Sequence, residues 1–410
     1  MIRKNLLQFL FSGSCLWRWN DKLRPVELSE IEKQAHKMLV ACVLLHESTK
    51  ELPTEERVSL ERRVIEGGLF DYFFRLVITD IKPPVFYRIR ENPRQYRELA
   101  KYTLSRLEPR LSQLGNFWKR LEAWHSEQPD ENDLARKILN AAHLFASQWE
   151  FRLIEPLNPF DEEMSYISNS FQEGLNALGG LPALDAIRNR ENALGKFANL
   201  CGQLRFQIRW TQAPRLPATS VLGHMFIVAA TVYLYSLAID ASPARGCNNF
   251  FSGLFHDFPE VLTRDIISPV KGSISGLSEI IREYEESELE RRVLGPLRKN
   301  GYARLAERIG WYLGLPLGSE FREACRIDGK VQVLDSFADL KSFDKNEYDP
   351  RDGLLLKKCD LLAAYLEAHS SIRNGVTSSQ LVSALPRLQS TILDKAPEEL
   401  NFESLLADFD

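Results

Sequence analysis

Cysteine is scarce in this chain of 410 residues, which contains six cysteines and no C-x-x-C pair. So few thiols at such spacings form neither a disulfide framework nor a zinc site of the paired-cysteine kind. We therefore expect reduced, mostly buried thiols and a cytoplasmic protein. Two further enzyme signatures are missing, the glycine-rich phosphate loop and the Gly-x-Ser-x-Gly elbow of the α/β-hydrolases.

An excess of charge of one sign is also lacking, since 52 basic and 56 acidic residues give a net charge of −4. This balance argues against a general nucleic-acid binder. No apolar run reaches the roughly 20 residues that cross a bilayer. The longest run, Met225–Ile239, is expected to be a buried core helix, and the run Leu6–Phe11 is too short for a signal peptide. We expect no membrane partner.

Helical periodicity, in contrast, is present along most of the chain and predicts an all-α protein. Period-two alternation is scarce, although residues 330–334 could form a short strand, and residues 326–352 are expected to be an irregular excursion between helices. The segments with apolar residues at helical spacing are Leu28–Leu45, Glu55–Leu69, Arg94–Trp124, Asp133–Trp149, Asn192–Ile208, Leu222–Leu237, Leu277–Arg298 and Gly353–His369.

A series of short matches indicates an internal repeat. Gly68-Leu69-Phe70, Asp80-Ile81 and Pro84-Val85 recur 185 residues later as Gly253-Leu254-Phe255, Asp265-Ile266 and Pro269-Val270. Three looser matches keep the same order along the chain: Arg18-Trp19 with Arg209-Trp210, His36 with His224, and Lys137–Asn140 with Lys357–Asp360. We interpret the series as a tandem duplication of two helical bundles, with unrelated helical domains as the alternative.

The two copies differ at the polar positions. The second copy has His256, Asp257 and Glu260 where the first has Asp71, Tyr72 and Arg75, and Asp360 is matched by Asn140. The first copy therefore lacks these side chains, and we expect it to be structural or regulatory. The predicted organisation is a degenerate domain over residues 1–160, a connecting segment over 161–194 and a second domain over 195–410. The two copies would form a pseudo-dimer within one chain, and pairing of whole chains stays open.

Four residues of the second copy are suited to hold one divalent metal ion. His256 and Asp257 are adjacent, His224 precedes them by one helix, and Asp360 lies in a later apolar helix where an uncompensated carboxylate would be costly to bury. Two imidazoles and two carboxylates suit a divalent transition metal and leave coordination positions for water and substrate. In a continuous helix, Glu260 would project into the same cavity. We expect one ion, with Mn, Co, Mg, Fe, Ni and Zn all open.

These residues resemble the motif of the HD superfamily of metal-dependent phosphohydrolases, in particular the 5′-deoxynucleotidases of the YfbR type. The resemblance covers about residues 197–405. The blocks that carry it are Ile208-Arg209-Trp210, His224, His256-Asp257-x-x-Glu260-Val-Leu-Thr-x-Asp265, Pro269-Val270-Lys271 and Lys358-Cys359-Asp360-Leu-Leu-Ala-Ala-Tyr365-Leu.

The resemblance implies a role for each matching residue. His224, His256, Asp257 and Asp360 would bind the metal, with Asp257 also part of the catalytic group. Glu260 would be the acid/base that acts on the attacking water. The residues expected near the substrate are Arg209 at the phosphate, Trp210 beside the sugar, Asp265 near the sugar hydroxyls, and Lys271.

The sequence departs from the family pattern at two positions and in one interval. Gly223 stands where an acidic residue usually precedes the first histidine, and Arg264 replaces a glycine before Asp265. The stretch between Asp257 and Asp360 is longer than the family leads us to expect, and an insertion around 300–350 could cover the site. These departures bear on the substrate more than on the metal.

The predicted function is hydrolysis of a nucleotide phosphate ester, with a 5′-(deoxy)nucleoside monophosphate as the leading substrate. Hydrolysis of nucleoside triphosphates or of signalling nucleotides is an alternative within the superfamily. A nucleotide sensor or interaction protein that binds without cleaving is an alternative outside enzymes. Retention of all four candidate metal ligands together with Glu260 in the second copy favours catalysis.

Overall fold

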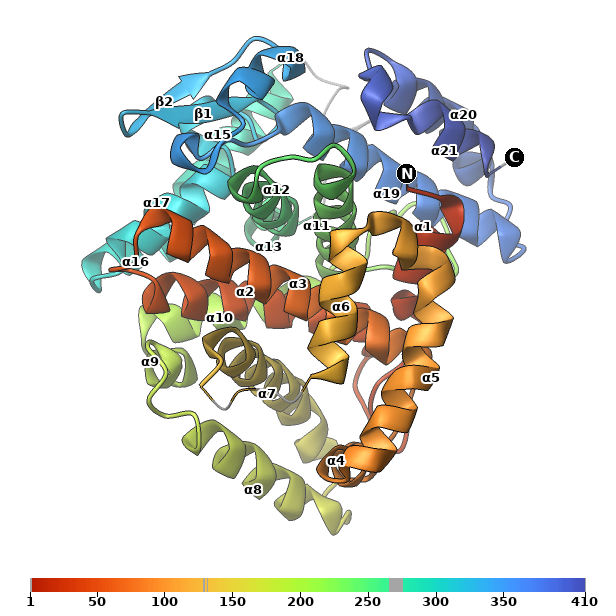
Figure 1. Cartoon of the computed structure of the whole chain (residues 1–410), viewed down its shortest axis with the longest axis vertical. Helices are drawn as coiled ribbons and strands as arrows, with labels where there is room; N and C mark the ends of the chain where they lie inside the picture. Colours follow the sequence, from red (N-terminus) through yellow and green to blue (C-terminus); the bar gives the residue numbers. More distant parts are fainter. Residues whose placement is uncertain (1, 128–129, 131, 265–275, 410) are drawn as a thin grey trace.

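The computed structural model describes residues 2–127, 130, 132–264 and 276–409 (Figure 1). The fold is all-α, as the periodicity predicted, with one small antiparallel hairpin as the only sheet in the described part.

The first half of the chain forms an array of helices that are connected by short turns. The elements are α1 (Lys4–Phe11), η1 (Ser12–Cys15), α2 (Glu30–Ser48), α3 (Thr54–Ile78), α4 (Pro83–Glu91), α5 (Pro93–Leu111), η2 (Ser112–Leu114), α6 (Asn116–Ser126), α7 (Leu134–Ile154), η3 (Glu155–Leu157), α8 (Glu163–Asn176) and α9 (Leu184–Arg188).

The second half begins with a further helical series and adds the hairpin. The elements are α10 (Ala193–Gln203), η4 (Leu204–Phe206), α11 (Val221–Ala238), α12 (Pro243–Phe255), α13 (Glu260–Thr263), α15 (Leu277–Leu289), η5 (Glu290–Leu294), α16 (Gly295–Lys299), α17 (Ala303–Tyr312), η6 (Leu315–Leu317), β1 (Ala324–Ile327), β2 (Lys330–Val333), α18 (Phe337–Leu340), η7 (Lys341–Phe343), η8 (Asn346–Tyr348), α19 (Gly353–Arg373), α20 (Ser379–Leu393), η9 (Glu398–Leu400) and α21 (Phe402–Ala407).

Polar caps fix where the principal helices begin. Ser29 and Glu32 form a reciprocal capping box at α2, and the Ser220 side chain accepts from the backbone of Gly223 at α11. The expected helix over 94–124 is instead two helices, α5 and α6. It is interrupted at Gly115, whose φ of 54° is a left-handed conformation that glycine adopts without strain. The predicted strand at 330–334 is confirmed as β2.

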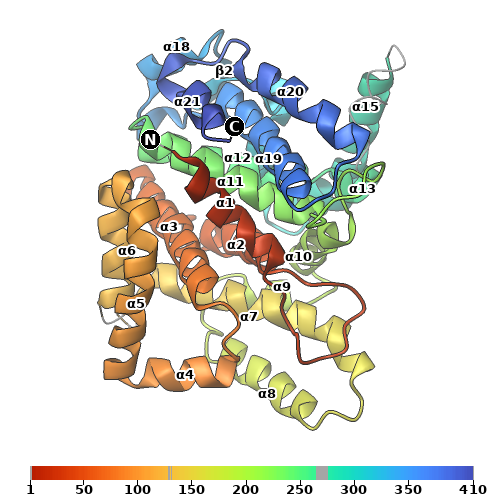
Figure 2. The ribbon, with the colours of Figure 1, turned by 90° about the vertical axis from the view of Figure 1, so that its right-hand side faces the viewer.

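The two halves share one core, and its largest cluster of buried side chains runs from Ile2 to Phe409. Helices α2 and α3 of the first half lie beside α11 and α12 of the second (Figure 1). Each half also contributes a helix to the other: α1 of the first half packs on α11 and α19, and α10 of the second half packs on α2 and α7 (Figure 2). The proposed domain boundaries at 160 and 195 therefore stay a prediction.

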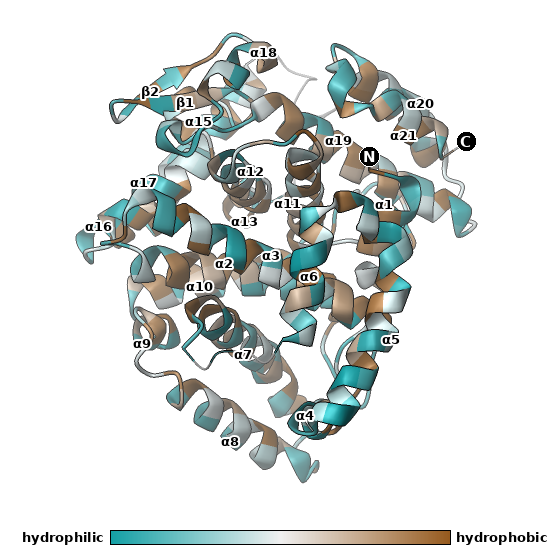
Figure 3. Cartoon of the chain, viewed as in Figure 1, coloured by the Kyte–Doolittle hydropathy of each residue, from teal (hydrophilic) through white to brown (hydrophobic). Residues whose placement is uncertain are grey.

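Helix α11 lies at the centre and is apolar along its whole length (Figure 3). In the described part of the chain it is the one helix long and apolar enough to span a membrane by length and composition, with a mean hydropathy of 1.7. Nearly all of it is buried within the protein, as expected for a core helix. The cysteines are unpaired, and all except Cys15 are buried, as predicted.

Candidate metal centre

Close packing of two helices brings the first histidine near the second. His224 lies in the first turn of α11, and α12 crosses α11 at Gly253. A Cβ at Gly253 would lie 2.8 Å from the Cα of Ala229, so only glycine permits this approach. Because α12 ends at Phe255, His256 follows immediately at the edge of that contact.

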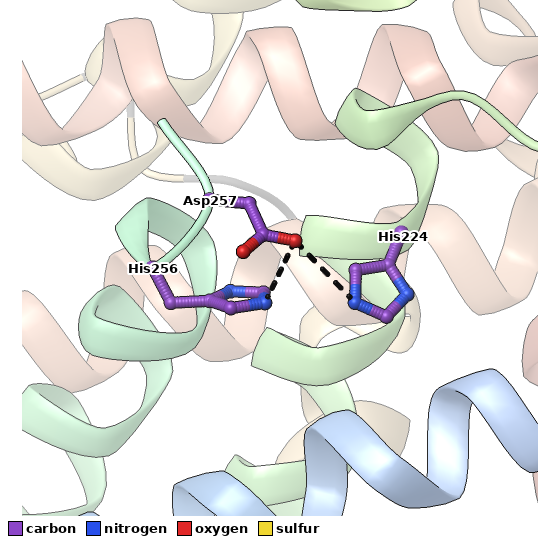
Figure 4. Close-up of side chains that lie close together, drawn as sticks. All are labelled: His224, His256 and Asp257. Atoms are coloured by element: carbon purple, nitrogen blue, oxygen red, sulfur yellow. Dashed lines mark ion pairs between the residues drawn. The ribbon is translucent and has the colours of Figure 1, made fainter. Parts of the chain in front are cut away.

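The helix does not continue through the motif, which corrects the expectation of a continuous helix from Phe255 to Asp265. Residues 256–259 form a turn, with the Phe258 amide donating to the Phe255 carbonyl, and α13 starts at Glu260. Asp257 thereby projects from the turn toward both histidines (Figure 4).

The four predicted ligands converge, although they come from three separate helical regions. Asp257 Oδ2 lies 3.2 Å from His256 Nε2 and 3.7 Å from His224 Nε2. Asp360 Oδ1, from α19, lies 3.0 Å from His224 Nε2 and 3.8 Å from His256 Nε2. The His224, His256 and Asp257 donors all lie within 4.8 Å of one another.

These spacings fit a single metal ion. Ligand atoms about 2.1 Å from one ion lie about 3.0 Å apart at a right angle and about 3.4 Å apart at the tetrahedral angle. The four distances span that interval and slightly beyond it. The side chains of Asp257 and Asp360 are 21% and 26% exposed, so Asp360 is less buried than its apolar helix suggested. A ligand could therefore reach the carboxylates from solvent.

The histidine ring orientations also suit coordination. His256 Nδ1 lies 2.8 Å from the Gly253 carbonyl, so a proton on Nδ1 is donated there and leaves the Nε2 lone pair free. His256 Nε2 is buried, has no hydrogen-bond partner and lies next to carboxylate oxygens. A metal ion at this position would satisfy the nitrogen and the oxygens together.

The same groups shift one another's pKa values. Burial alone would lower the pKa of His256, but the Asp257 carboxylate, and then Asp360, raise it to about 9. Burial acts on Asp257 in the opposite direction, yet His256 and then Arg209 hold its pKa below the ordinary range. A hydrogen bond from His224 is the largest of the effects that keep the pKa of Asp360 low against burial.

Glu367 also contacts the site, although the sequence did not single it out. Its side chain is fully buried, and its Oε1 lies 3.5 Å from His224 Nδ1. It also accepts from Trp210 Nε1 at 2.8 Å and from the Thr219 hydroxyl at 2.7 Å. A carboxylate at the outer nitrogen of a ligating histidine orients the ring and makes it more basic. One signal was present, because Glu367 lies seven residues after Asp360, on the same face of the apolar helix α19.

Two of the predicted substrate residues are tied to this carboxylate network. Arg209 Nη1 donates to Asp257 Oδ2 at 3.1 Å, and Arg209 Nε lies 3.5 Å from Glu367. Glu367, and then Asp257, raise the pKa of Arg209 against the effect of burial. Trp210 is held by its indole nitrogen on Glu367 and packs against Ala213, so its ring borders the site.

Glu260 is nearly buried and lies close enough to Arg209 for its charge to raise the arginine pKa. Gln207 Nε2 donates to the Glu260 backbone carbonyl at 2.9 Å, which anchors the start of α13. Asp265 and Lys271, the other two predicted substrate residues, lie outside the described residues.

The long interval before Asp360 includes a further acidic residue near the site. Glu320 lies near enough to His256 and Asp257 for both to influence its pKa, which burial raises. The hairpin β1–β2 packs on its own small core around Cys325 and Leu340. Two surface hollows of about 560 and 360 Å³, lined by residues such as Arg3 and Glu55, lie away from the metal ligands.

The comparison with known families agrees with this donor set. Residues 201–389 match the HD domain. The match includes all four converging side chains, and HD domains in general are metal-dependent phosphohydrolases that bind divalent ions. Neither the curated proteins nor the solved structures gave a match.

Proposed function

We propose that the HD domain hydrolyses a nucleotide phosphate monoester, with a 5′-(deoxy)nucleoside monophosphate as the leading substrate. The convergence of His224, His256, Asp257 and Asp360 is the observation that carries the proposal. A divalent ion bound by them would supply positive charge to the phosphate and acidify water. Cytoplasmic location remains part of the proposal.

Arg209 is suited to bind the phosphate. Its side chain is 14% exposed and its guanidinium lies 3.1 Å from Asp257, so it borders the metal position and can donate to a phosphate oxygen. In the described part of this site, Arg209 is the basic side chain that contacts a predicted metal ligand. One arginine beside one metal ion suits a single phosphate better than the larger charge of a triphosphate.

Glu260 is suited to move the proton. Hydrolysis adds water across the ester: the P–O bond to the nucleoside breaks, a bond from phosphorus to the water oxygen forms, and the leaving oxygen takes a proton. A carboxylate close to Arg209 can accept the proton of the water and return it to the leaving group. Trp210, held by Glu367, offers a ring face to the nucleoside.

The test combines metal analysis with phosphate release. Purified full-length protein is assayed on nucleoside mono- and triphosphates with added Mn²⁺, Co²⁺ or Mg²⁺. Asp257→Ala is expected to abolish release, whereas the exposed control Asp185→Ala keeps it. Release from triphosphates alone would transfer the proposal to triphosphate hydrolysis. Nucleotide binding without any release would support a sensor, and absence of metal binding would refute the metal centre.

A further inference from the structure

The first half of the chain contains the same local framework as the HD site, 191 residues earlier. Trp17 pairs with Ser29 as Ile208 pairs with Ser220, and each serine caps the following helix. Trp19 and Trp210 lie two residues after Trp17 and Ile208, and both have a φ of 58°. This conformation is uncommon for a bulky residue, so its recurrence marks an equivalent position.

The anchor of the site recurs as well. Trp19 Nε1 donates to Glu150 Oε2 at 3.0 Å, as Trp210 does to Glu367. Arg18 Nε donates to the same carboxylate oxygen at 2.8 Å, in the position that Arg209 occupies beside Glu367. Glu150 and Glu367 are both fully buried.

This framework fixes the register and corrects two sequence matches. Counting four residues from each capping serine, Lys33 and not His36 stands at the position of His224. Counting seven residues back from each buried glutamate, His143 and not Asn140 stands at the position of Asp360. Lys33 Nζ lies 2.6 Å from His143 Nδ1, which parallels the 3.0 Å contact of His224 with Asp360.

Lys33 meets a carboxylate that the HD site does not have. Glu30 replaces Val221 at the first helical position, and its Oε1 lies 3.7 Å from Lys33 Nζ. Arg18 Nη1 lies 2.7 Å and Arg75 Nε 3.7 Å from Glu30 Oε2. Lys33 and Glu30 are almost completely buried, and they compensate each other's charge, while the two arginines compensate Glu30 further.

The charge state of Glu30 agrees with this arrangement. Burial alone would raise its pKa, but Lys33, then Arg18 and Arg75, lower it to about 2. Burial lowers the pKa of Lys33 to about 7 although Glu30 opposes the change, so the amine is about half protonated at neutral pH and a cation at lower pH.

We infer that the first half contains a counterpart of the metal site that is filled by the chain itself, with the Lys33 amine in place of the metal ion and the Glu30 carboxylate in place of a bound anion. Such a site needs neither metal nor phosphate. His143 and Arg18 hold the two substituting groups where ligands would otherwise be required.

The filled counterpart also joins the two halves. Arg205, from η4 of the second half, donates through Nη1 to Glu150 Oε1 at 2.9 Å, and both side chains are buried. Arg205 also lies over the Trp149 ring, 4.8 Å from its centroid. The inferred role of the counterpart is therefore to hold Arg205, and with it the start of the HD domain, against the first half.

The experiment uses full-length protein with Lys33→Met, Glu30→Gln, the double variant and Arg205→Met, beside the exposed control Asp185→Ala. Each single variant is expected to lower the melting temperature by roughly 3 °C or more, because it removes one partner of a buried charge. The double variant should lose less than the sum of the two singles. Metal content should stay near one ion per chain in all of them.

The ligand-free character is tested on Asp257→Ala, with Mn²⁺ and inorganic phosphate as probes in calorimetry. Adding Lys33→Met to this variant should not reduce the binding of either probe. Binding of either probe that depends on Lys33 would overturn the inference. Unchanged melting temperatures in both Lys33→Met and Glu30→Gln would overturn it as well. If Lys33→Met does not fold, Glu30→Gln carries the same comparison, because it keeps the shape of the side chain.

Discussion

Glu367 offers the sharpest test of how the HD site is held together. The change Glu367→Gln preserves the shape of the side chain and leaves an oxygen for the Trp210 indole. It removes the negative charge that faces His224 Nδ1, Arg209 and Arg215. The new amide also points N–H groups toward side chains that are themselves hydrogen-bond donors and cannot accept from it. We therefore expect weaker orientation of His224 and poorer compensation of the arginines.

The structure sets the size of both effects. Loss of the outer partner of a ligating histidine weakens metal binding by about 10- to 100-fold, or about 1.4–2.7 kcal/mol. The lost ion pairs with Arg209, Arg215 and His224 cost about 1.5–3 kcal/mol of unfolding free energy. The bond from Trp210 can persist, and the Thr219 hydroxyl can accept from the new amide instead of donating. Metal affinity is measured by competition with a coloured chelator, and stability by thermal denaturation.

Glu150→Gln is the matched control, because Glu150 holds Trp19 and Arg18 by the same contacts but has no metal ligand beside it. It should lose similar stability and keep its metal affinity. If Glu367→Gln binds metal within about threefold of the unchanged protein, the role assigned to Glu367 is refuted.

Three further outcomes are expected. The pKa of Glu30 is lowered from 4.5 to about 2 in the folded state, so its stabilisation of the fold is present above pH 4.5 and is lost as the pH falls toward 2. Glu30→Gln should therefore make the melting temperature fall less steeply at acid pH, and an unchanged acid limb of the profile would contradict this. Gly253→Ala should lower the unfolding free energy by about 1–3 kcal/mol and weaken metal binding through His256. Gly246→Ala in the same helix, where an added Cβ has its nearest contact at 3.4 Å, should leave the unfolding free energy nearly unchanged in a denaturation experiment. Chelation should lower the melting temperature, since metal at 100 times its Kd stabilises by about 2.7 kcal/mol; Asp257→Ala should be insensitive to the chelator, and equal sensitivity would argue that the metal binds elsewhere.

The metal ligands could be predicted from the sequence because their chemistry is rare and local. An adjacent His256-Asp257 pair, an earlier histidine and a later aspartate within an apolar helix form a donor set that suits a divalent metal and that helix packing alone does not require. The all-α fold followed from helical periodicity in the same way. The periodicity did not predict the break at Gly115 or the turn after Phe255. A single residue with a left-handed φ, or a single proline, can end a helix while the apolar pattern continues.

Glu367 and Lys33 could not be assigned from the sequence. A buried charged residue in a helix gives no local signal of which distant group it faces, and Glu367 meets Trp210, Thr219 and His224, which lie more than 140 positions earlier in the chain. In the first half, matching histidine with histidine placed His36 opposite His224, one helical turn away from the register that the capping serines define.

The sequence by itself therefore determined which residue types are available for metal chemistry and which segments form helices, since both depend on neighbours along the chain. The tertiary structure decided which side chains share a site, which carboxylate orients His224, and that Lys33 faces His143. The physical reason is that electrostatic contacts act over a few ångströms in space, while the residues that make them are more than a hundred positions apart in the chain.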